Sequence, residues 1–296
     1  MIHQDTAARA GAPAAVDVLI PTFRREVALA VTLTSLLGQT FRDFRIVVSD
    51  QDDAADAADV REVQAIARVM RARGHAVTIR KHLPRRGMAE QREFLLGCAQ
   101  APHALFLDDD VIVEPDLLQR LVATLAKYRC GFVGSAVIGL SYVDDVRPND
   151  QAIEFIDGDV TPETIRPDTP QWQRHRLHSA ANLYHVAQRL RLDVGHQRIY
   201  RIAWVGGCVL YDAAKLRACG GFGFWHDLPP EHCGEDVFAQ QRVMARFGGC
   251  GLIPSGAYHQ ELPTTLPRRE VDAPKVLNLH TPEHRAAPSC APRAHS

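Results

Sequence analysis

Short apolar runs alternate with helix-patterned segments through the first 125 residues, and this alternation constrains the fold more than any other feature. Four runs have the length and composition of buried strands, at residues 16–20, 45–49, 76–81 and 104–107. The predicted helices between them end near Gly38, Gly74 and Ala99. Strands that alternate with helices of about a dozen residues form βαβ units in a mostly parallel sheet. The sequence therefore predicts an α/β fold.

The pattern changes after the fourth strand. Pro115 and Asp116 open a predicted helix whose apolar stripe reaches Leu125. From residue 140 to 201 the chain is rich in Pro, Asp, His and Arg, and only a helix around 178–192 is predicted there. Strand and helix patterns then return at residues 202–211, 213–219 and 235–247.

Composition places the chain among globular proteins. It has 296 residues, of which 46% are hydrophobic and 23% are charged, so it can bury a substantial core. The formal net charge of −1 provides no long-range attraction for nucleic acid or anionic lipid. Nucleic acid is therefore not an expected partner, whereas the sequence leaves oligomeric state and peripheral membrane contact open.

Cysteine usage and the N-terminus bear on location. The seven cysteines are scattered without a C-x-x-C pair, which argues against a disulfide framework or structural zinc site and favours a reducing compartment. The first 17 residues lack the charged region and apolar core of a signal peptide. No apolar stretch approaches the ~20 residues that cross a bilayer. A cytoplasmic protein is the expectation.

Three consecutive aspartates, Asp108, Asp109 and Asp110, follow the apolar run 104–107. Adjacent carboxylates at the end of a buried strand repel one another and cost energy to desolvate. A divalent cation such as Mg²⁺ or Mn²⁺ would offset that cost, since hard cations prefer oxygen ligands. Side chains alternate along an extended segment, so Asp108 and Asp110 are expected to point the same way. Taken alone, such a triplet is more often a solvated acidic loop, and its neighbours decide between the two interpretations.

A second acidic position, Asp50, follows the strand predicted at 45–49. In sheets built from βαβ units, ligands bind beyond the carboxyl ends of the strands. We therefore expect Asp50 and the aspartate triplet to share one crevice.

Seven short motifs occur in a fixed order along the chain. They are Pro21-Thr22-Phe23-Arg24-Arg25, Val47-Val48-Ser49-Asp50, Gly87-Met88-Ala89-Glu90-Gln91-Arg92, Phe106-Leu107-Asp108-Asp109-Asp110, Gly206-Gly207-Cys208, Gly220-Gly221-Phe222 and Gly234-Glu235-Asp236. The ordered set, spread over residues 16–139 and 202–259, resembles the family 2 glycosyltransferases of the GT-A fold. The chain departs from the family pattern at two places. It has Ser49-Asp50-Gln51-Asp52 where the family usually has Asp-Asp-Gly-Ser, and Gln91-Arg92-Glu93 where the family has Ala-Arg-Asn. These departures put the preference for a particular nucleotide base in doubt.

The resemblance implies roles for individual residues. Nucleotide-sugar contacts are implied for Pro21, Thr22, Phe23, Arg24, Asp50, Gly87, Arg92, Asp108, Asp109 and Arg268. A divalent metal, Mn²⁺ or Mg²⁺, would be held by Asp108 and Asp110, with His259 completing its ligands. Asp236 resembles the catalytic base of inverting members, and Glu235 stands beside it.

The resemblance also implies an architecture and a reaction. A GT-A type, Rossmann-like βαβ sandwich is expected as one domain over residues 1–262, followed by a partly disordered C-terminal extension at 263–296. Within the domain, 16–139 would bind the nucleotide sugar, and 202–262 would be the acceptor and catalytic half. The irregular insert 140–201 matches no family pattern, and its place between the two acidic sites leads us to expect that it shapes the acceptor pocket. The expected reaction is inverting transfer from a nucleotide-diphosphate sugar, UDP-sugar favoured, to a hydroxyl of a glycan, a lipid-linked or a small-molecule acceptor.

Plainer interpretations stay open for several of these residues. Glu235 and Asp236 at a helix start also suit the helix dipole. Asp50 also suits a turn, and His259 also suits a packed core. For Arg85, Arg86 and Trp225, the sequence does not decide between contact with a ligand and a purely structural role.

Other protein classes share part of the pattern. Asp108-x-Asp110 resembles the motif of haloacid-dehalogenase-type phosphatases, but Ile112 stands where that motif has Thr or Val. Nucleotidyltransferases share the sheet and the metal, but need a Gly-rich loop where this chain has Pro21-Thr22-Phe23. A non-catalytic sugar-nucleotide-binding protein is a third alternative, against which the presence of both Asp110 and Asp236 argues.

Overall fold

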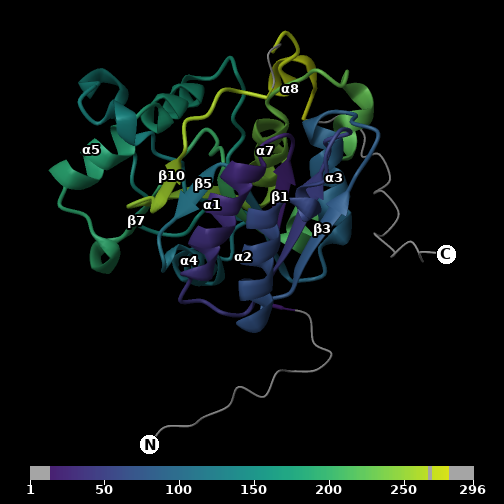
Figure 1. Cartoon of the computed structure of the whole chain (residues 1–296). Helices are drawn as coiled ribbons and strands as arrows, with labels where there is room; N and C mark the ends of the chain where they lie inside the picture. The colour runs from purple at the N-terminus through teal and green to yellow at the C-terminus, as the bar shows by residue number, and fades with distance from the viewer. Residues whose placement is uncertain (1–13, 266–268, 280–296) are drawn as a thin grey trace, which may run out of the picture.

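The computed structural model describes residues 14–265 and 269–279, and its centre is an eight-stranded sheet in the order β3-β2-β1-β4-β8-β6-β9-β7 (Figure 1). The strands are β1 (Val16–Thr22), β2 (Phe44–Asp50), β3 (Val77–Lys81), β4 (His103–Leu107), β6 (Phe132–Gly134), β7 (Arg198–Tyr200), β8 (Cys208–Asp212) and β9 (Gly249–Ile253). Strands β8 and β7 run against the other six. The predicted α/β fold with a mostly parallel sheet is confirmed, and the two antiparallel strands were not predicted.

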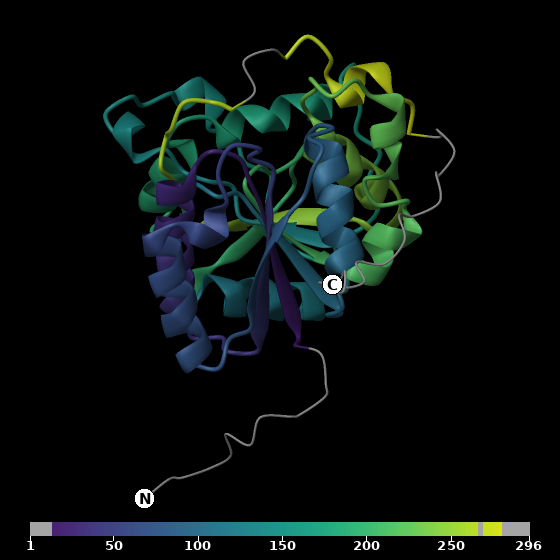
Figure 2. The same ribbon diagram turned by 45° about the vertical axis from the view of Figure 1, so that its right-hand side comes forward.

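Helices cover both faces of this sheet, as Figure 2 shows. They are α1 (Glu26–Leu37), α2 (Arg61–Ala72), α3 (Met88–Cys98), α4 (Leu117–Tyr128), α5 (Asn182–Arg189), α6 (Ala213–Ala218), α7 (Glu235–Phe247) and α8 (Ala273–Val276). Apolar side chains of α1, α2 and α4 form one buried cluster with the sheet, and those of α3, α5, α6 and α7 form another. The molecule is therefore a three-layer sandwich, in which the βαβ crossovers place helices on both faces.

Strand β1 lies in the middle of the sheet, and all seven of its residues are buried. We expected it to stop before Pro21, but it continues to Thr22. Pairing with β4 ends at Leu19, whereas pairing with β2 reaches Thr22 opposite Asp50. Proline is tolerated here because β4 no longer lies opposite Pro21, so its missing N–H interrupts no hydrogen bond on that side.

The segment 140–201 is more regular than its composition suggested. It contains a 3₁₀ helix at Pro170–His178, helix α5 and strand β7, which pairs with β9 at the sheet edge. Its side chains Ile165, Leu177 and Val186 are buried in the same cluster as those of α7. The segment thus belongs to the core as well as to the surface.

Two further observations concern covalent bonding and membranes. Cys98 is disulfide-bonded, which the scattered spacing of the cysteines did not predict. Within the described residues, the cysteines that form no disulfide are Cys130, Cys208, Cys219, Cys233 and Cys250. No helix within residues 14–265 and 269–279 is long and apolar enough to span a bilayer. Of the C-terminal extension expected to be partly disordered, residues 266–268 and 280–296 lie outside the described residues.

Candidate functional site

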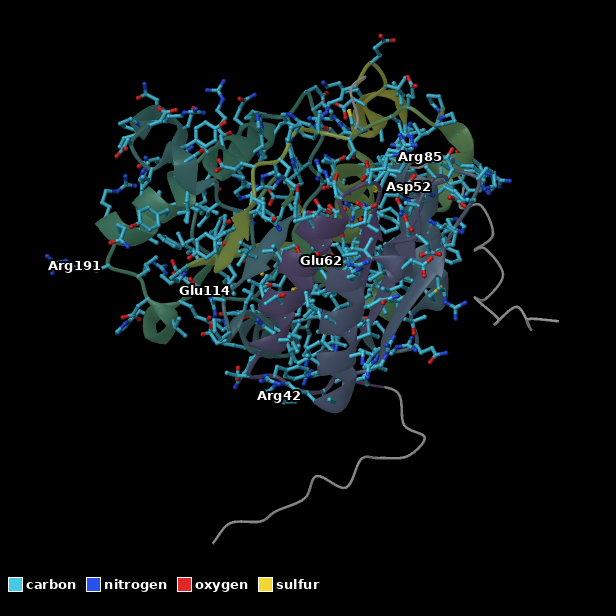
Figure 3. All side chains as sticks on the ribbon, in the orientation of Figure 1. Arg42, Asp52, Glu62, Arg85, Glu114 and Arg191 are labelled. Carbon is cyan, nitrogen blue, oxygen red and sulfur yellow. The ribbon has the colours of Figure 1, made fainter. Side chains whose placement is uncertain are left out.

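A cavity of about 380 Å³ opens at the carboxyl ends of β1 and β4. In Figure 3 the labelled Asp52 and Arg85 lie at this end of the sheet, and Arg42 lies at the opposite end. Asp110 and Asp236, which are 126 positions apart by their numbers, both line the cavity. The other predicted residues that line it are Pro21, Thr22, Phe23, Arg92, Asp108, Asp109, Glu235 and His259.

Each aspartate of the triplet has a different partner. The Asp108 carboxylate accepts a hydrogen bond from Arg92 Nη2 at 3.0 Å. Asp109 Oδ2 accepts one from the Thr22 hydroxyl at 2.7 Å, and Asp110 Oδ2 accepts one from Arg25 Nη1 at 2.6 Å. Asp109 and Asp110 are only 6% and 2% exposed, so the triplet is not a solvated loop.

The environments of Asp109 and Asp110 drive their pKa values apart. Burial raises the pKa of Asp109 to about 7, despite the hydrogen bond from Thr22. At Asp110 burial acts in the same direction, but the hydrogen bond and charge of His259, together with the charge of Arg25, hold its pKa below the usual value. Asp110 is therefore the carboxylate of this buried pair that stays ionised.

The neighbouring two-stranded sheet places His259 beside the triplet. Strand β5 (Val111–Val113) follows Asp110 directly and pairs antiparallel with β10 (Ala257–His259), with His259 opposite Val111. His259 Nε2 consequently lies 3.3 Å from Asp110 Oδ2, and Asp110 raises the pKa of the imidazole. The Glu261 N–H donates to His259 Nδ1 at 2.8 Å, so a neutral ring must carry its proton on Nε2, facing Asp110.

The donor chemistry fits a hard divalent cation, because the Asp108 and Asp110 carboxylates line one cavity. Among the described residues, however, no three His, Cys, Asp or Glu side chains converge as a ready metal centre. Asp110 Oδ2 is taken by Arg25, and the His259 Nε2 proton points at the same oxygen. Asp108 and Asp110 therefore suit the ion, whereas His259 suits it only when its proton is on Nδ1 instead of Nε2, which gives up the hydrogen bond from Glu261 N–H.

The first turn of α7 also contributes to the cavity lining. Gly234 precedes the helix and has φ at +73°, and a Cβ at this position would lie only 2.4 Å from Asp272 Oδ1. Both features favour glycine here. Glu235 Oε1 accepts a hydrogen bond from Arg92 Nε at 3.0 Å, so Arg92 bridges Glu235 and Asp108. Asp236 accepts the N–H of Val237 at 2.8 Å. Burial, with the adjacent negative charge of Glu235, raises the pKa of Asp236 to about 7.

Helix α3 carries Arg92 and is held at its start by a distant loop. Gly87 has φ at +104°, and a Cβ there would lie 2.6 Å from the His232 ring. His232 Nδ1 donates to the Pro229 carbonyl at 2.7 Å, and Nε2 accepts the N–H of Ala89 at 3.1 Å. Gly87 therefore lies behind the cavity wall and permits this close contact, whereas the next residue, Met88, lines the cavity.

Besides Gly87, two described residues expected at the nucleotide, Asp50 and Arg24, are not part of the cavity lining. The Asp50 carboxylate accepts the backbone N–H groups of Asp52 and Ala57 at 2.8 and 2.9 Å and pairs with Lys81 at 2.6 Å. It thereby shapes the loop that brings Gln51 to the cavity, and its contact with a base stays a prediction. Arg24 pairs with Asp52 and Asp53, and its side chain is 55% exposed. Arg268 lies outside the described residues.

Several lining residues were not predicted as site residues. Arg25 and Gln91 stand inside motifs that the sequence analysis singled out, so their positions were the available signal. Arg85 also lines the cavity, with its guanidinium 3.9 Å from the Phe23 ring centre. The remaining ones are Gln51, Met88, Cys233, Gly234, Leu262, Thr264, Thr265 and Arg269. Several come from the segment expected to be a C-terminal extension, which local sequence patterns cannot assign to a distant cavity.

Comparisons with known proteins agree with this fold. The model of the family described as "Glycosyl transferase family 2" matches residues 17–201. Residues 1–349 of TarS from S. aureus, solved in complex with UDP-GlcNAc, superpose with a TM-score of 0.51 at 15% identity, covering 85% of this chain and 60% of that one. Another structure of the same TarS fragment has a TM-score of 0.50 at 15% identity, covering 82% and 60%. The chain thus spans 60% of the length of both structures. A search of curated proteins finds no match.

Proposed function

Because this chain belongs to glycosyl transferase family 2, whose model matches residues 17–201, we propose that it transfers a sugar from a nucleotide-diphosphate sugar to an acceptor hydroxyl with inversion. The observation that supports this most is that one cavity is lined both by the aspartate triplet and by Asp236. Such a transfer needs charge stabilisation for the departing diphosphate and a base for the acceptor, and the triplet and Asp236 offer one each.

The donor would lie along β1 and the start of α3. Phe23 and Thr22 line this part of the cavity, next to Gln51. The guanidinium groups of Arg85 and Arg269 also line it and suit phosphate oxygens, to which Arg gives charge-assisted hydrogen bonds. A UDP-sugar is the favoured donor, with which the fold-level likeness to a protein solved with UDP-GlcNAc is compatible.

Asp108 and Asp110 would hold a divalent cation, Mn²⁺ or Mg²⁺, and His259 would join with its proton on Nδ1 instead of Nε2. When bound, such an ion acts as a Lewis acid on the phosphate oxygens. Arg92 meanwhile holds the Asp108 carboxylate in place from α3. The carboxylate oxygens suit the cation, and the arginines make the cavity partly basic. Both sources of positive charge favour a diphosphate over a neutral ligand.

Asp236 would take the proton of the acceptor hydroxyl. Arg92 is already paired with Glu235 and Asp108, which leaves Asp236 as the carboxylate on α7 that is not bound to a guanidinium group. Its pKa of about 7 suits a general base at neutral pH. A base on the face opposite the diphosphate assists direct displacement, which inverts the configuration at the sugar carbon. The acceptor, whether glycan, lipid-linked or small molecule, is not identified by these residues.

Donor binding is tested with a thermal-shift panel of UDP, GDP, dTDP and their sugars, each with and without Mn²⁺. A ligand at 100 times its dissociation constant adds about 2.7 kcal/mol to the free energy of unfolding, which is readily measured. We expect stabilisation by at least one sugar nucleotide and a larger one with Mn²⁺. No stabilisation by any of them would overturn the proposal.

The role of Asp236 is tested by Asp236→Asn. Hydrolysis of the bound donor or its transfer to an acceptor should fall by roughly 10²–10⁴-fold, while donor affinity stays within about twofold of the parent. In the parent, turnover should rise as pH increases through about 7, where the Asp236 carboxyl loses its proton. Asp157→Asn, at an exposed surface position, is the matched control. Loss of donor binding in Asp236→Asn would show that the residue has a different role. If the parent binds donors but turns none over, the alternative of a non-catalytic sugar-nucleotide-binding protein is favoured.

A further inference from the structure

The Arg25 guanidinium is built into the aspartate triplet. Its Nη1 lies 2.6 Å from Asp110 Oδ2 and 3.5 Å from Asp109 Oδ1. The side chains of Arg25 and Asp110 are 15% and 3% exposed, so this ion pair lies mostly out of water. An arginine in a protein keeps its charge at every ordinary pH. The triplet therefore has a permanent positive partner of its own.

This partner contacts the atom that a divalent cation would need. Asp110 Oδ2 also has His259 Nε2 at 3.3 Å, so two donors converge on one oxygen. A cation coordinated by that oxygen would meet the positive guanidinium at close range, where two like charges repel strongly in a poorly hydrated cavity. Arg25 and the cation consequently compete for Asp110.

The other end of the same guanidinium reaches a segment that lines the cavity. Arg25 Nη2 donates to the carbonyl of Pro263. Residues 260–265, which we call the strap, follow β10 and contribute Leu262, Thr264 and Thr265 to the cavity lining. The strap is also tied down where Gln260 N–H donates to the Asp110 carbonyl at 2.9 Å. Arg25 thus joins the triplet to the strap.

We propose that Arg25 is an internal counter-ion of the ion-free site, and that binding of a divalent cation at Asp110 displaces its guanidinium and releases the strap from it. The inference rests on the proposed function, because it takes Asp110 as a ligand of the cation. Arg25 acts here through Asp110 and the strap and is a positioning residue. Its presence lowers the affinity for the free cation and couples cation binding to opening of the cavity.

The test measures Mn²⁺ binding by electron paramagnetic resonance, without nucleotide, in the full chain. Arg25→Gln should bind Mn²⁺ at least about tenfold more tightly than the parent, because it removes the competing charge while keeping a hydrogen-bonding side chain. Arg25→Lys retains the charge and should stay within about threefold of the parent. Arg24→Gln is the matched control, because Arg24 is the adjacent arginine but pairs with Asp52 and Asp53. The Mn²⁺ affinity of this variant should equal that of the parent.

Equal or weaker Mn²⁺ binding by Arg25→Gln, with a normal melting temperature, would overturn the inference. Asp110→Asn separates it from the proposed function: if that variant binds Mn²⁺ like the parent, Asp110 is no ligand and the proposed metal site fails as well. Hydrogen exchange of the strap amides provides a second readout. Mn²⁺ should speed this exchange in the parent and change it little in Arg25→Gln, and an Mn²⁺-independent rate in the parent would contradict the coupling.

Discussion

Burial decides the charge of single side chains in this protein, and it does so in both directions. It raises the pKa of the Asp236 carboxyl to about 7 and lowers the pKa of the His178 imidazole to about 4. His178 Nε2 lies 3.0 Å from the Tyr200 hydroxyl, beneath the 3₁₀ helix that ends with it. In both cases the neutral form is favoured, since a charge away from water is costly. The raised pKa of Asp236 suits a general base, and the lowered pKa of His178 makes the stability of the folded protein depend on pH.

His178→Gln tests that consequence. The unfolded chain binds a proton at His178 below about pH 6.5, whereas the folded protein does so only below about pH 4. The parent therefore loses stability as pH falls from about 6.5 towards 4, and the variant should lose less. Urea titration gives the free energy of unfolding of the parent and of His178→Gln at each pH. The difference between these two free energies should change by about 2 kcal/mol between pH 7.5 and pH 4.5.

Among the helices, α7 serves the site twice. Its first turn carries Glu235 and Asp236, and its second turn carries Gln240, whose amide accepts the Val205 N–H at 2.8 Å and donates to the Val205 carbonyl at 2.7 Å. This clamp holds the chain just before Gly206 against the helix. A Cβ at Gly206 would lie 3.9 Å from Asp236 Oδ2, in ordinary van der Waals contact, so this backbone lies against that carboxylate. One helix thus positions both a catalytic candidate and the backbone that faces it.

Gln240→Leu should therefore destabilise the protein by about 2 kcal/mol or more, since it leaves the buried N–H and C=O of Val205 without their partner. Gln241→Leu is a matched control at the next position. Gln241 is also buried, but its Nε2 has no hydrogen-bond partner within the described residues, so its loss should cost less than about 0.5 kcal/mol or stabilise. Chemical denaturation compares the two. Equal effects would show that the Val205 clamp is not what stabilises this region.

Taken as a whole molecule, the protein unites its two acidic sites through one continuous sheet and a shared core. Segment 140–201 contributes to both, through β7 at the sheet edge and through Leu177, which is 2% exposed. A segment with buried contacts of this kind is not a detachable module. The expectation that this segment shapes the acceptor pocket therefore applies to its exposed residues.

Leu177→Ala should lower the free energy of unfolding by about 2–5 kcal/mol, as for other buried leucines. Leu190→Ala, in the same segment but 41% exposed, should change it by less than about 0.5 kcal/mol. Tryptophan fluorescence and circular dichroism should report one coincident transition in both variants. A separate early transition confined to Leu177→Ala would show that 140–201 unfolds independently of the rest.

Much of the fold could be predicted because its determinants are local. The strands at 45–49 and 104–107 and the helix at 235–247 appear within a few residues of their predicted places. Other features depended on remote partners. The helix expected from Pro115 begins at Leu117, and β8 and β7 are antiparallel, which no local spacing indicates.

By itself the sequence determined the βαβ order, the apolar strands and the family, because periodicity and ordered motifs are written in neighbouring residues. Only the tertiary structure decided which polar partners meet. It paired Arg25 with Asp110 and tied Asp50 into its own loop rather than into the cavity lining. The physical reason is that a buried charge takes whichever opposite charge the packing brings within a few ångströms, and that choice joins residues far apart in the chain.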